Sequence, residues 1–310
     1  MIDELGLSPG SSRGGAGEGT PEGGEAYRST SMWRSILMVF VENRMATVGV
    51  GLILFMVLFS FVGPLIYHTQ QVLNNPLIAD EAPSLAHPLG TDQVGYDVVG
   101  RLMLGGQSSL EIGFAAAFIA VGIGVVWGAI AGLAGGPIDA FMMRIVDAFL
   151  AIPYLFALIL LGSIFSTSIP ELILVIGLVA WLVPARLVRG ETLTLRVREY
   201  VQAVQVMGGG KRRILIRHII PNAVGVIVVN ATFQVADAIV FVAVLSYLGL
   251  GVPPPATNWG GQLSSGLNFF FDGYWWLIYP AGFAIVLTVV AFNFVGDALR
   301  DSLEVRRYRR

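Results

Sequence analysis

Residues 112–133 read IGFAAAFIAVGIGVVWGAIAGL, a run of 22 residues that contains no Asp, Glu, Lys or Arg. A helix rises 1.5 Å per residue, so about 20 consecutive apolar residues are needed to cross the hydrocarbon core of a bilayer. This run therefore predicts a transmembrane helix. It also indicates the fold class of the whole chain, an all-α integral membrane protein.

The composition of the chain agrees with that fold class. Of its 310 residues, 55% are hydrophobic and 13% are charged, and the mean hydropathy is +0.72. Soluble domains are usually about 45–50% apolar and about 25% charged. The chain has no cysteine, which excludes disulfides and thiolate metal sites. Its three histidines are far apart in sequence, so we expect no metal site.

Six apolar stretches predict about six transmembrane spans. They are residues 46–66, 112–133, 145–164, 172–187, 223–248 and 275–294. The fourth stretch is short and contains Pro184. The third contains Pro153, which packed membrane helices tolerate.

The remaining segments have distinct compositions. We expect residues 1–31, rich in Gly, Ser, Pro and Glu, to be a disordered tail, and 32–45 to form a short interfacial helix. A domain of six spans then covers 46–305, and 306–310 is a basic tail. Within the domain, the long loops are residues 68–108 on one side of the membrane and 189–221 on the other.

The basic residues predict the orientation. If the N-terminus is cytoplasmic, 18 of the 19 Lys and Arg residues fall on the inside, and only Arg101 falls outside. The positive-inside rule then places both termini in the cytoplasm. Tyr274, Trp275, Trp276 and Tyr279 cluster where the sixth span meets the outer interface, as aromatic belts do.

The long cytoplasmic loop contains a short helical pattern. Between residues 199 and 207, Tyr200, Val201, Val204 and Met207 recur at helical spacing. Three glycines follow, and a second basic stretch leads into the fifth span. A short helix held at the membrane surface between breakers suits docking into a groove on another protein. A basic loop that serves only membrane topology is the alternative, and the residues alone leave both open.

Residues 199–222 resemble the cytoplasmic loop of ABC importer permeases, whose pattern is E-A-A-x3-G-x9-I-x-L-P. Gln202-Ala203-Val204 stands at E-A-A, Gly208 at the glycine, and 218–221 at I-x-L-P. This sequence departs from the pattern at Gln202, Val204 and His218. The longer form, E-Y-V-x-A followed by G and R-H-I-[IL]-P-N, is similar to the dipeptide, oligopeptide and nickel branch, in which a histidine at 218 is expected.

Four further blocks resemble the same branch in the same order. They lie at residues 87–98 (HPLGTD, then G and DV), 139–153, 245–260 (LSYLGLG, then PP and WG) and 292–301. The resemblance covers about residues 32–305. The first and third blocks are similar to the second of the two permease subunits in that branch.

The resemblance implies a type I ABC importer permease in a bacterial inner membrane. Its expected partners are a homologous permease, two ABC ATPase subunits or one fused ATPase, an external solute-binding protein and membrane lipid. ATP and Mg would bind the ATPases, with no cofactor on this chain. The residues that the resemblance assigns to ATPase coupling are Glu199, Tyr200, Val201, Gln202, Ala203, Gly208, Arg217 and His218.

No catalytic pattern is present in the sequence. The segment Gly208–Lys211 superficially resembles a phosphate-binding loop, but that motif needs Ser or Thr after the lysine, and Arg212 stands there. We expect no enzyme activity, no metal site and no nucleic-acid partner. The acidic residues of the external loop are interpreted as solvated surface; they are Asp80, Glu81, Asp92 and Asp97.

Polar residues within the spans are candidates for the transport pathway. Asp237 lies sixteen residues past Pro221, or about 24 Å along a helix, which is beyond the bilayer midplane. Asn230 and Gln234 lie on the same helical face. We interpret the three as pathway-lining, with hydrogen bonding between helices as the alternative. Arg144 and Asp147, three residues apart, are expected to form a structural ion pair.

Two other functional classes remain as alternatives. A secondary transporter predicts internal repeats and paired ionisable residues near the midplane, and a membrane-bound enzyme predicts a catalytic constellation. Neither feature is found in the sequence. Di- and oligopeptides are the leading substrate, and nickel chelates, haem, glutathione-like peptides and oligosaccharides are the alternatives that the resemblance allows.

Overall fold

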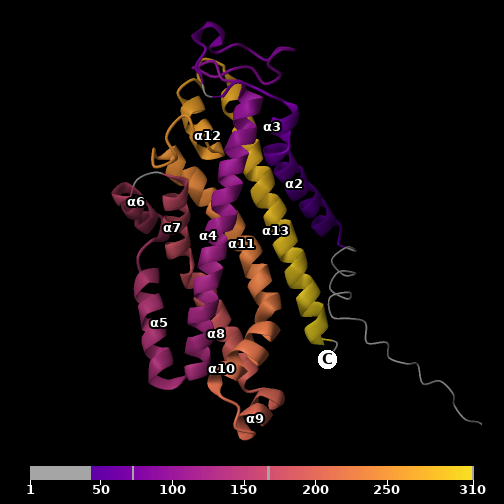
Figure 1. The fold of residues 1–310 in the computed structure, drawn as a ribbon, viewed down its shortest axis with the longest axis vertical. Coiled ribbons are helices and arrows are strands. Elements are labelled where there is room, and N and C mark those ends of the chain that lie inside the picture. The colour runs from indigo at the N-terminus through magenta and orange to yellow at the C-terminus, as the bar shows by residue number, and fades with distance from the viewer. Residues whose placement is uncertain (1–42, 72, 166–167, 309–310) are drawn as a thin grey trace, which may run out of the picture.

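The computed structural model describes residues 43–71, 73–165 and 168–308, and this part of the chain is helical with one isolated β-bridge, between Thr91 and Asp97. The predicted disordered tail and nearly all of the predicted interfacial helix lie outside the described residues. Figure 1 shows an elongated bundle, with the short helix α9 at one end and the loops that follow α3 at the other.

Four segments among the described residues are long and apolar enough to cross a membrane as single helices. They are α2 (Arg44–Phe61), α4 (Val98–Ala134), the segment Lys211–Tyr247 and the segment Trp275–Leu303. The third consists of α10 (Lys211–Ile214), the π-turn η2 (Leu215–Ile219) and α11 (Ile220–Tyr247). The fourth lies within η3 (Trp275–Leu277) and α13 (Tyr279–Tyr308). These four match the predicted first, second, fifth and sixth spans.

The third predicted span is divided into two helices. α5 (Gly136–Leu150) and α6 (Tyr154–Ile164) meet at 80°, and Pro153 is the N-cap residue of α6. Pro153 was expected to lie within one span, but a proline supplies no N–H for the helical ladder and disfavours helical geometry at the residue before it. If the pair crosses the membrane as one span, that span is broken in the middle.

The fourth predicted span is also bent, and the bend explains a buried glutamine. α7 (Ile169–Ala180) and α8 (Leu182–Arg196) meet at 42°, just before Pro184. A proline cannot bond the carbonyl four residues earlier, which here belongs to Ala180. The Gln234 side chain, on α11, donates a hydrogen bond of 2.9 Å to that carbonyl oxygen and so satisfies it.

The second membrane helix is longer than its apolar run. α4 begins at Val98, where Asp97 accepts a hydrogen bond of 2.8 Å from the backbone N–H of Gly100 as the N-cap. Residues 98–108, which the sequence assigned to the external loop, form the first turns of this helix. Polar residues such as Arg101 and Gln107 lower the hydropathy of this part of the sequence, but a capped helix can continue beyond the bilayer.

α4 is the central helix of the bundle, and it contacts α2, α7, α8 and α11. Its contact with α8 depends on small residues. A Cβ atom built on Gly128 would lie 2.3 Å from the carbonyl oxygen of Ala185. Only glycine allows the two backbones to approach this closely, which is how small residues serve membrane helix packing.

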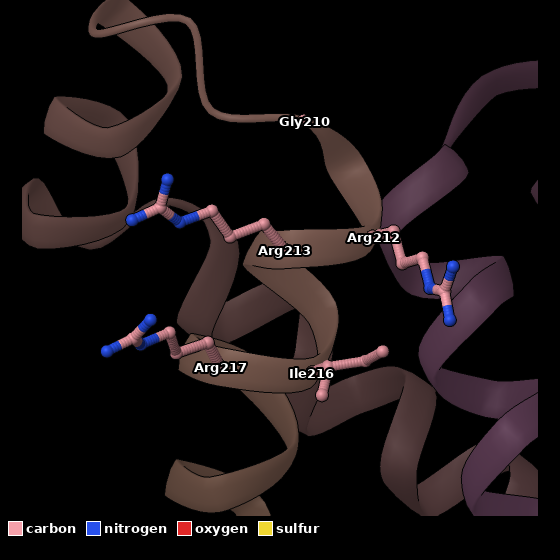
Figure 2. Close-up of a pocket in the computed structure, with 5 residues that line it drawn as sticks. All are labelled: Gly210, Arg212, Arg213, Ile216 and Arg217. Carbon is pink, nitrogen blue, oxygen red and sulfur yellow. The ribbon is translucent and has the colours of Figure 1, made fainter.

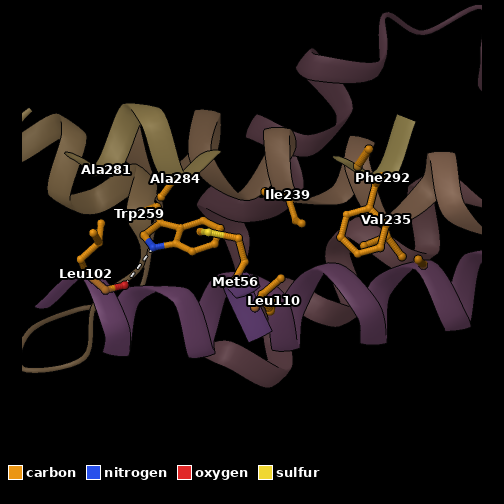
Figure 3. Packing of buried hydrophobic residues seen from close by; sticks show 11 residues of the cluster. Met56, Leu102, Leu110, Val235, Ile239, Trp259, Ala281, Ala284 and Phe292 are labelled. Carbon is orange, nitrogen blue, oxygen red and sulfur yellow. Dashed lines mark hydrogen bonds between the residues drawn. The ribbon is translucent and has the colours of Figure 1, made fainter. Parts of the chain in front are cut away.

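The largest core cluster joins helices from both halves of the sequence. Figure 3 shows Met56 of α2 beside Trp259, the first residue of α12 (Trp259–Leu267), with Ile239 of α11 and Phe292 of α13 further along the same cluster. Trp259 is fully buried, and its indole N–H donates to the Leu102 carbonyl oxygen at 3.0 Å. The cluster therefore connects α2, α4, α11 and α13 into one packed unit.

Two ion pairs connect α5 to α8. Arg189 contacts Asp139 at 2.6 Å, and Arg186 contacts Asp147 at 2.5 Å. The predicted pair of Arg144 with Asp147 is wrong. The spacing of three residues within one helix suggested that Arg144 pairs with Asp147. In the structure Asp147 pairs with Arg186 of the neighbouring helix α8, and Arg144 is exposed.

Candidate coupling helix and translocation face

The predicted docking helix is present at one tip of the bundle. α9 spans Glu199–Val206 and is the outermost helix at that end in Figure 1. It follows α8 after a short turn, and it ends at Gly208, whose φ is +80°. Gly208 N–H donates to the Gln205 carbonyl oxygen, and Gly209 N–H to that of Val204. A left-handed residue with these bonds is a common helix end, and it favours glycine.

One side of α9 anchors the helix to the rest of the chain. Val201 is fully buried in a cluster with Leu195, Ile214, Ile219 and Ala223, and Val204 packs against the same cluster. The sequence assigned Val201 to ATPase coupling, and the structure buries its side chain against its own chain. Its role is to hold α9 to the base of the bundle.

The opposite side of α9 is open. Glu199, Gln202 and Ala203 are exposed, as is Tyr200, which leaves 42% of its surface accessible. Val206 and Met207 are 88% and 76% exposed. Apolar side chains this exposed at the tip of a rigid helix favour a protein contact. The spacing in the sequence grouped Met207 with Val201 and Val204. It therefore did not predict that Val201 and Val204 pack inward while Met207 is exposed.

Arg217 and His218 lie on the π-turn η2, which joins α10 to α11. The His218 ring lies near that of Tyr200, with centroids 6.5 Å apart, and its carbonyl oxygen accepts from Asn222 Nδ2 at 2.6 Å. His218 therefore supports the side of α9 that carries Tyr200. Arg217 is exposed and extends away from the helix axis beside Arg213 (Figure 2).

The three predicted pathway residues have different environments. Gln234 is buried by its bond to the Ala180 carbonyl, so hydrogen bonding between helices describes it better than a pathway role. Asn230 is partly buried, and its Oδ1 atom has no hydrogen-bond partner among the described residues. Asp237 is exposed on the surface of α11. The structure thus does not present the three as one polar stripe.

The far end of the molecule carries a cap segment, residues 67–97 apart from 72, whose acidic residues the sequence interpreted as solvated surface. Asp97 is only 3% exposed. Its Oδ2 atom accepts a hydrogen bond from the Tyr67 hydroxyl at 2.9 Å and lies 2.9 Å from His87 Nδ1. Burial and this hydrogen bond raise the pKa of Tyr67 to about 12, so the hydroxyl stays protonated and donates.

Further contacts fix the cap segment to the helices. The one basic residue predicted outside, Arg101, donates to the Pro255 carbonyl oxygen at 2.8 Å and lies 3.8 Å from Asp92. The Trp276 indole N–H donates to the Thr91 carbonyl oxygen at 3.3 Å. The cap segment also forms part of a hollow of about 320 Å³ that His68, His87 and Asp97 help to line. The HPLGTD block of the sequence is thus a structural element of this end.

Comparisons with known families agree with this architecture. Residues 124–309 match the family described as binding-protein-dependent transport system inner membrane component. Residues 31–86 match the N-terminal TM domain of oligopeptide transport permease C. Together the two matches include α2, the C-terminal end of α4 from residue 124 and every later helix that the structure describes.

Characterised relatives match most of the chain. The oligopeptide transport system permease protein OppC of Bacillus subtilis (strain 168) is 41% identical over 277 residues, which is 89% of this chain and 90% of that protein. OppC of Escherichia coli (strain K12) is 39% identical and covers 88% of this chain and 91% of its own length. The dipeptide transport system permease protein DppC of B. subtilis is 36% identical, over 86% and 84% of the two chains.

A solved structure supports the fold. An inward-facing form of the MetNI methionine ABC transporter superposes with a TM-score of 0.53 at 20% identity, covering 64% of this chain and 94% of that one. At this identity the match concerns the fold alone, which is that of a type I importer permease. With the family match over 124–309 and 41% identity over 89% of its length, the chain belongs to the family of binding-protein-dependent transport system inner membrane components.

Proposed function

We propose that this chain is one of two membrane permease subunits of an ATP-driven importer for di- and oligopeptides. The observation that carries the proposal is α9, an exposed helix that Val201 anchors to the bundle and Gly208 ends. Such a helix can transmit the motion of a docked protein to α8 and α10, its neighbours in the chain, and to α11 through the cluster that joins Val201 with Ala223. The relatives named as oligopeptide and dipeptide permeases support peptides as the solute.

The chain itself would hydrolyse no ATP. ATP and Mg would bind two ABC ATPase subunits, or one fused ATPase, that dock on α9 through Tyr200, Ala203, Val206 and Met207. Closure of the ATPases on ATP would push α9, and α11 would carry this motion into the membrane domain. An external solute-binding protein would deliver the peptide at the end of the molecule that carries the cap segment.

Asp237 is the residue that best fits a pathway role. It carries a carboxylate on a membrane-crossing helix and is exposed on the isolated chain. A charge in the bilayer interior costs about 2.5–3.5 kcal/mol on insertion scales, so it faces water or a protein partner rather than lipid. We infer that this side of α11 faces the translocation pathway and the homologous permease.

The proposed orientation places α9 and both termini in the cytoplasm. Because the chain has no cysteine, single cysteines report topology without background. In intact cells, an impermeant maleimide should label Ser265→Cys, which lies on α12, and should label Thr194→Cys, on α8, only after the membrane is opened. Both side chains are exposed. Labelling of both positions in intact cells would contradict the orientation.

Assembly provides the test of the proposed function. Purified in mild detergent from its native host, the tagged chain should bring down a homologous permease and ABC ATPase subunits in fixed ratio. The complex in vesicles should take up a radiolabelled tripeptide only with ATP and the binding protein. Peptide uptake by this chain alone, driven by an ion gradient, would contradict the proposal and favour a secondary transporter.

A further inference from the structure

Basic side chains gather where the chain returns from α9 to the membrane. Arg212, Arg213 and Arg217 line a hollow of about 490 Å³ together with Gly210 and Ile216. Arg213 and Arg217 extend in parallel from the same side of the helix, whereas Arg212 extends in the opposite direction (Figure 2). Residues four apart share one side of a helix, so the pair presents two guanidinium groups together.

These two guanidinium groups have no partner within the described residues. No ion pair or side-chain hydrogen bond there involves Arg213 or Arg217, and both side chains are exposed. Parallel arginines repel each other unless an anion lies between them. Arg is also the side chain whose planar donors match a phosphate group best.

An apolar strip continues from the arginine pair along the membrane-crossing helix. Pro221, Val224 and Val228 follow Arg217 at spacings of four, three and four residues, so they lie on the same side. Pro221 is exposed, and Val228 leaves 43% of its surface accessible. Val224 between them is partly exposed, and two cations at the end of this apolar strip match the two parts of a phospholipid, its headgroup and its acyl chain.

We propose that Arg213 and Arg217 bind the phosphate of an anionic phospholipid, whose acyl chain lies along Pro221, Val224 and Val228. The site rests on the orientation proposed above, which places the arginines at the anionic cytoplasmic leaflet. A contact between these arginines and acidic side chains of an ATPase would leave the apolar strip unexplained, so the lipid accounts for more of the surface. The bound lipid would hold the α10–α11 junction, to which α9 is anchored.

Native mass spectrometry of the full-length chain, with whatever subunits co-purify, tests the site. The chain is purified from vesicles that contain phosphatidylglycerol and phosphatidylethanolamine. Wild type should retain phosphatidylglycerol, and the double variant Arg213→Gln with Arg217→Gln should retain roughly tenfold less, as expected when two charge-assisted bonds are lost. Arg144→Gln removes an exposed arginine from α5 and should retain as much as wild type.

Two further variants separate the headgroup from the acyl chain. Arg213→Lys with Arg217→Lys keeps both charges and should recover part of the retention. Val228→Trp fills the strip without changing a charge, and it should also release lipid. The first variant tests the charges and the second tests the strip, so the proposal can fail in either part.

Specific outcomes would overturn the lipid site. Equal phosphatidylglycerol in wild type and the double Gln variant would do so, as would displacement of the lipid by millimolar inorganic phosphate, which would identify a simple phosphate site. Loss of the ATPase subunits from the double Gln variant with unchanged lipid would assign the arginines to the ATPase contact instead.

Discussion

Gly208→Val and Ala203→Asp should each reduce peptide uptake by at least about tenfold while leaving the chain in the membrane. Gly208 has a φ of +80°, and nothing lies within 4 Å of the place where its Cβ would be, so the backbone conformation alone restricts this position. A left-handed conformation costs a residue with a Cβ about 1–2 kcal/mol, and a β-branched residue fits it worst. Valine should therefore change the direction in which the chain leaves α9.

Ala203→Asp tests the exposed side of α9, whereas Gly208→Val tests the end of the helix. Ala203 lies on the exposed side of α9, away from the Val201 anchor. An aspartate there leaves the isolated chain folded, but it places an unpaired charge in any protein contact that covers this side. Such a charge costs several kcal/mol in a packed interface.

Uptake and ATPase stimulation by loaded binding protein should be measured at matched amounts of membrane-inserted chain. Gly51→Val is the matched control for glycine replacement, because Gly51 has no neighbour within 4 Å of its missing Cβ and no positive φ. Ala203→Ser is the control for size without charge. Wild-type uptake by both test variants would show that the loop serves only topology and would end the coupling hypothesis.

The region around α9 shows what the local spacing of residues can predict. The spacing of apolar residues predicted a helix over 199–207, and three glycines predicted its end, because both depend on a few consecutive residues. The inward face of α9 could not be predicted in the same way. Val201 is buried because Ile214 and Ile219, from the next segment of chain, lie against it.

Long-range partners explain the other differences. Gln234 and Asp237 both read as polar residues in an apolar helix, but only Gln234 lies opposite the carbonyl that Pro184 leaves free. The hydropathy of residues 98–108 indicated a loop, since a sum over side chains does not detect the Asp97 cap that starts α4. For Gln234 the deciding contact joins residues that are distant in sequence. For α4 it is a hydrogen bond from a backbone N–H to the capping side chain.

Asp97→Ala should destabilise the cap segment by about 3 kcal/mol, the largest stability effect expected from a single polar substitution at this end of the molecule. Three donors use its carboxylate. Gly100 N–H bonds Oδ1 at 2.8 Å, and the Tyr67 hydroxyl and His87 Nδ1 each lie 2.9 Å from Oδ2. Alanine removes the N-cap of α4, leaves His87 Nδ1 without its carboxylate partner, and leaves the Tyr67 hydroxyl only the Ala86 carbonyl oxygen at 3.4 Å.

The loss should appear as a lower melting temperature of the purified complex and as faster proteolysis within residues 67–97. Asp97→Asn should have an intermediate effect, because asparagine caps a helix as well as aspartate does, but its single acceptor oxygen is then used by Gly100 and an NH2 group faces Tyr67 and His87. Asp272→Ala removes an exposed acid beyond α12 and should change the free energy of unfolding by no more than about 0.5 kcal/mol. If Asp97→Ala and Asp272→Ala have the same melting temperature, the Asp97 carboxylate does not stabilise the cap segment. If the cap segment alone is cleaved while the bundle melts normally, the hydrogen bond from Trp276 to Thr91 does not couple this end to the long helices, and the cap segment unfolds as an independent unit.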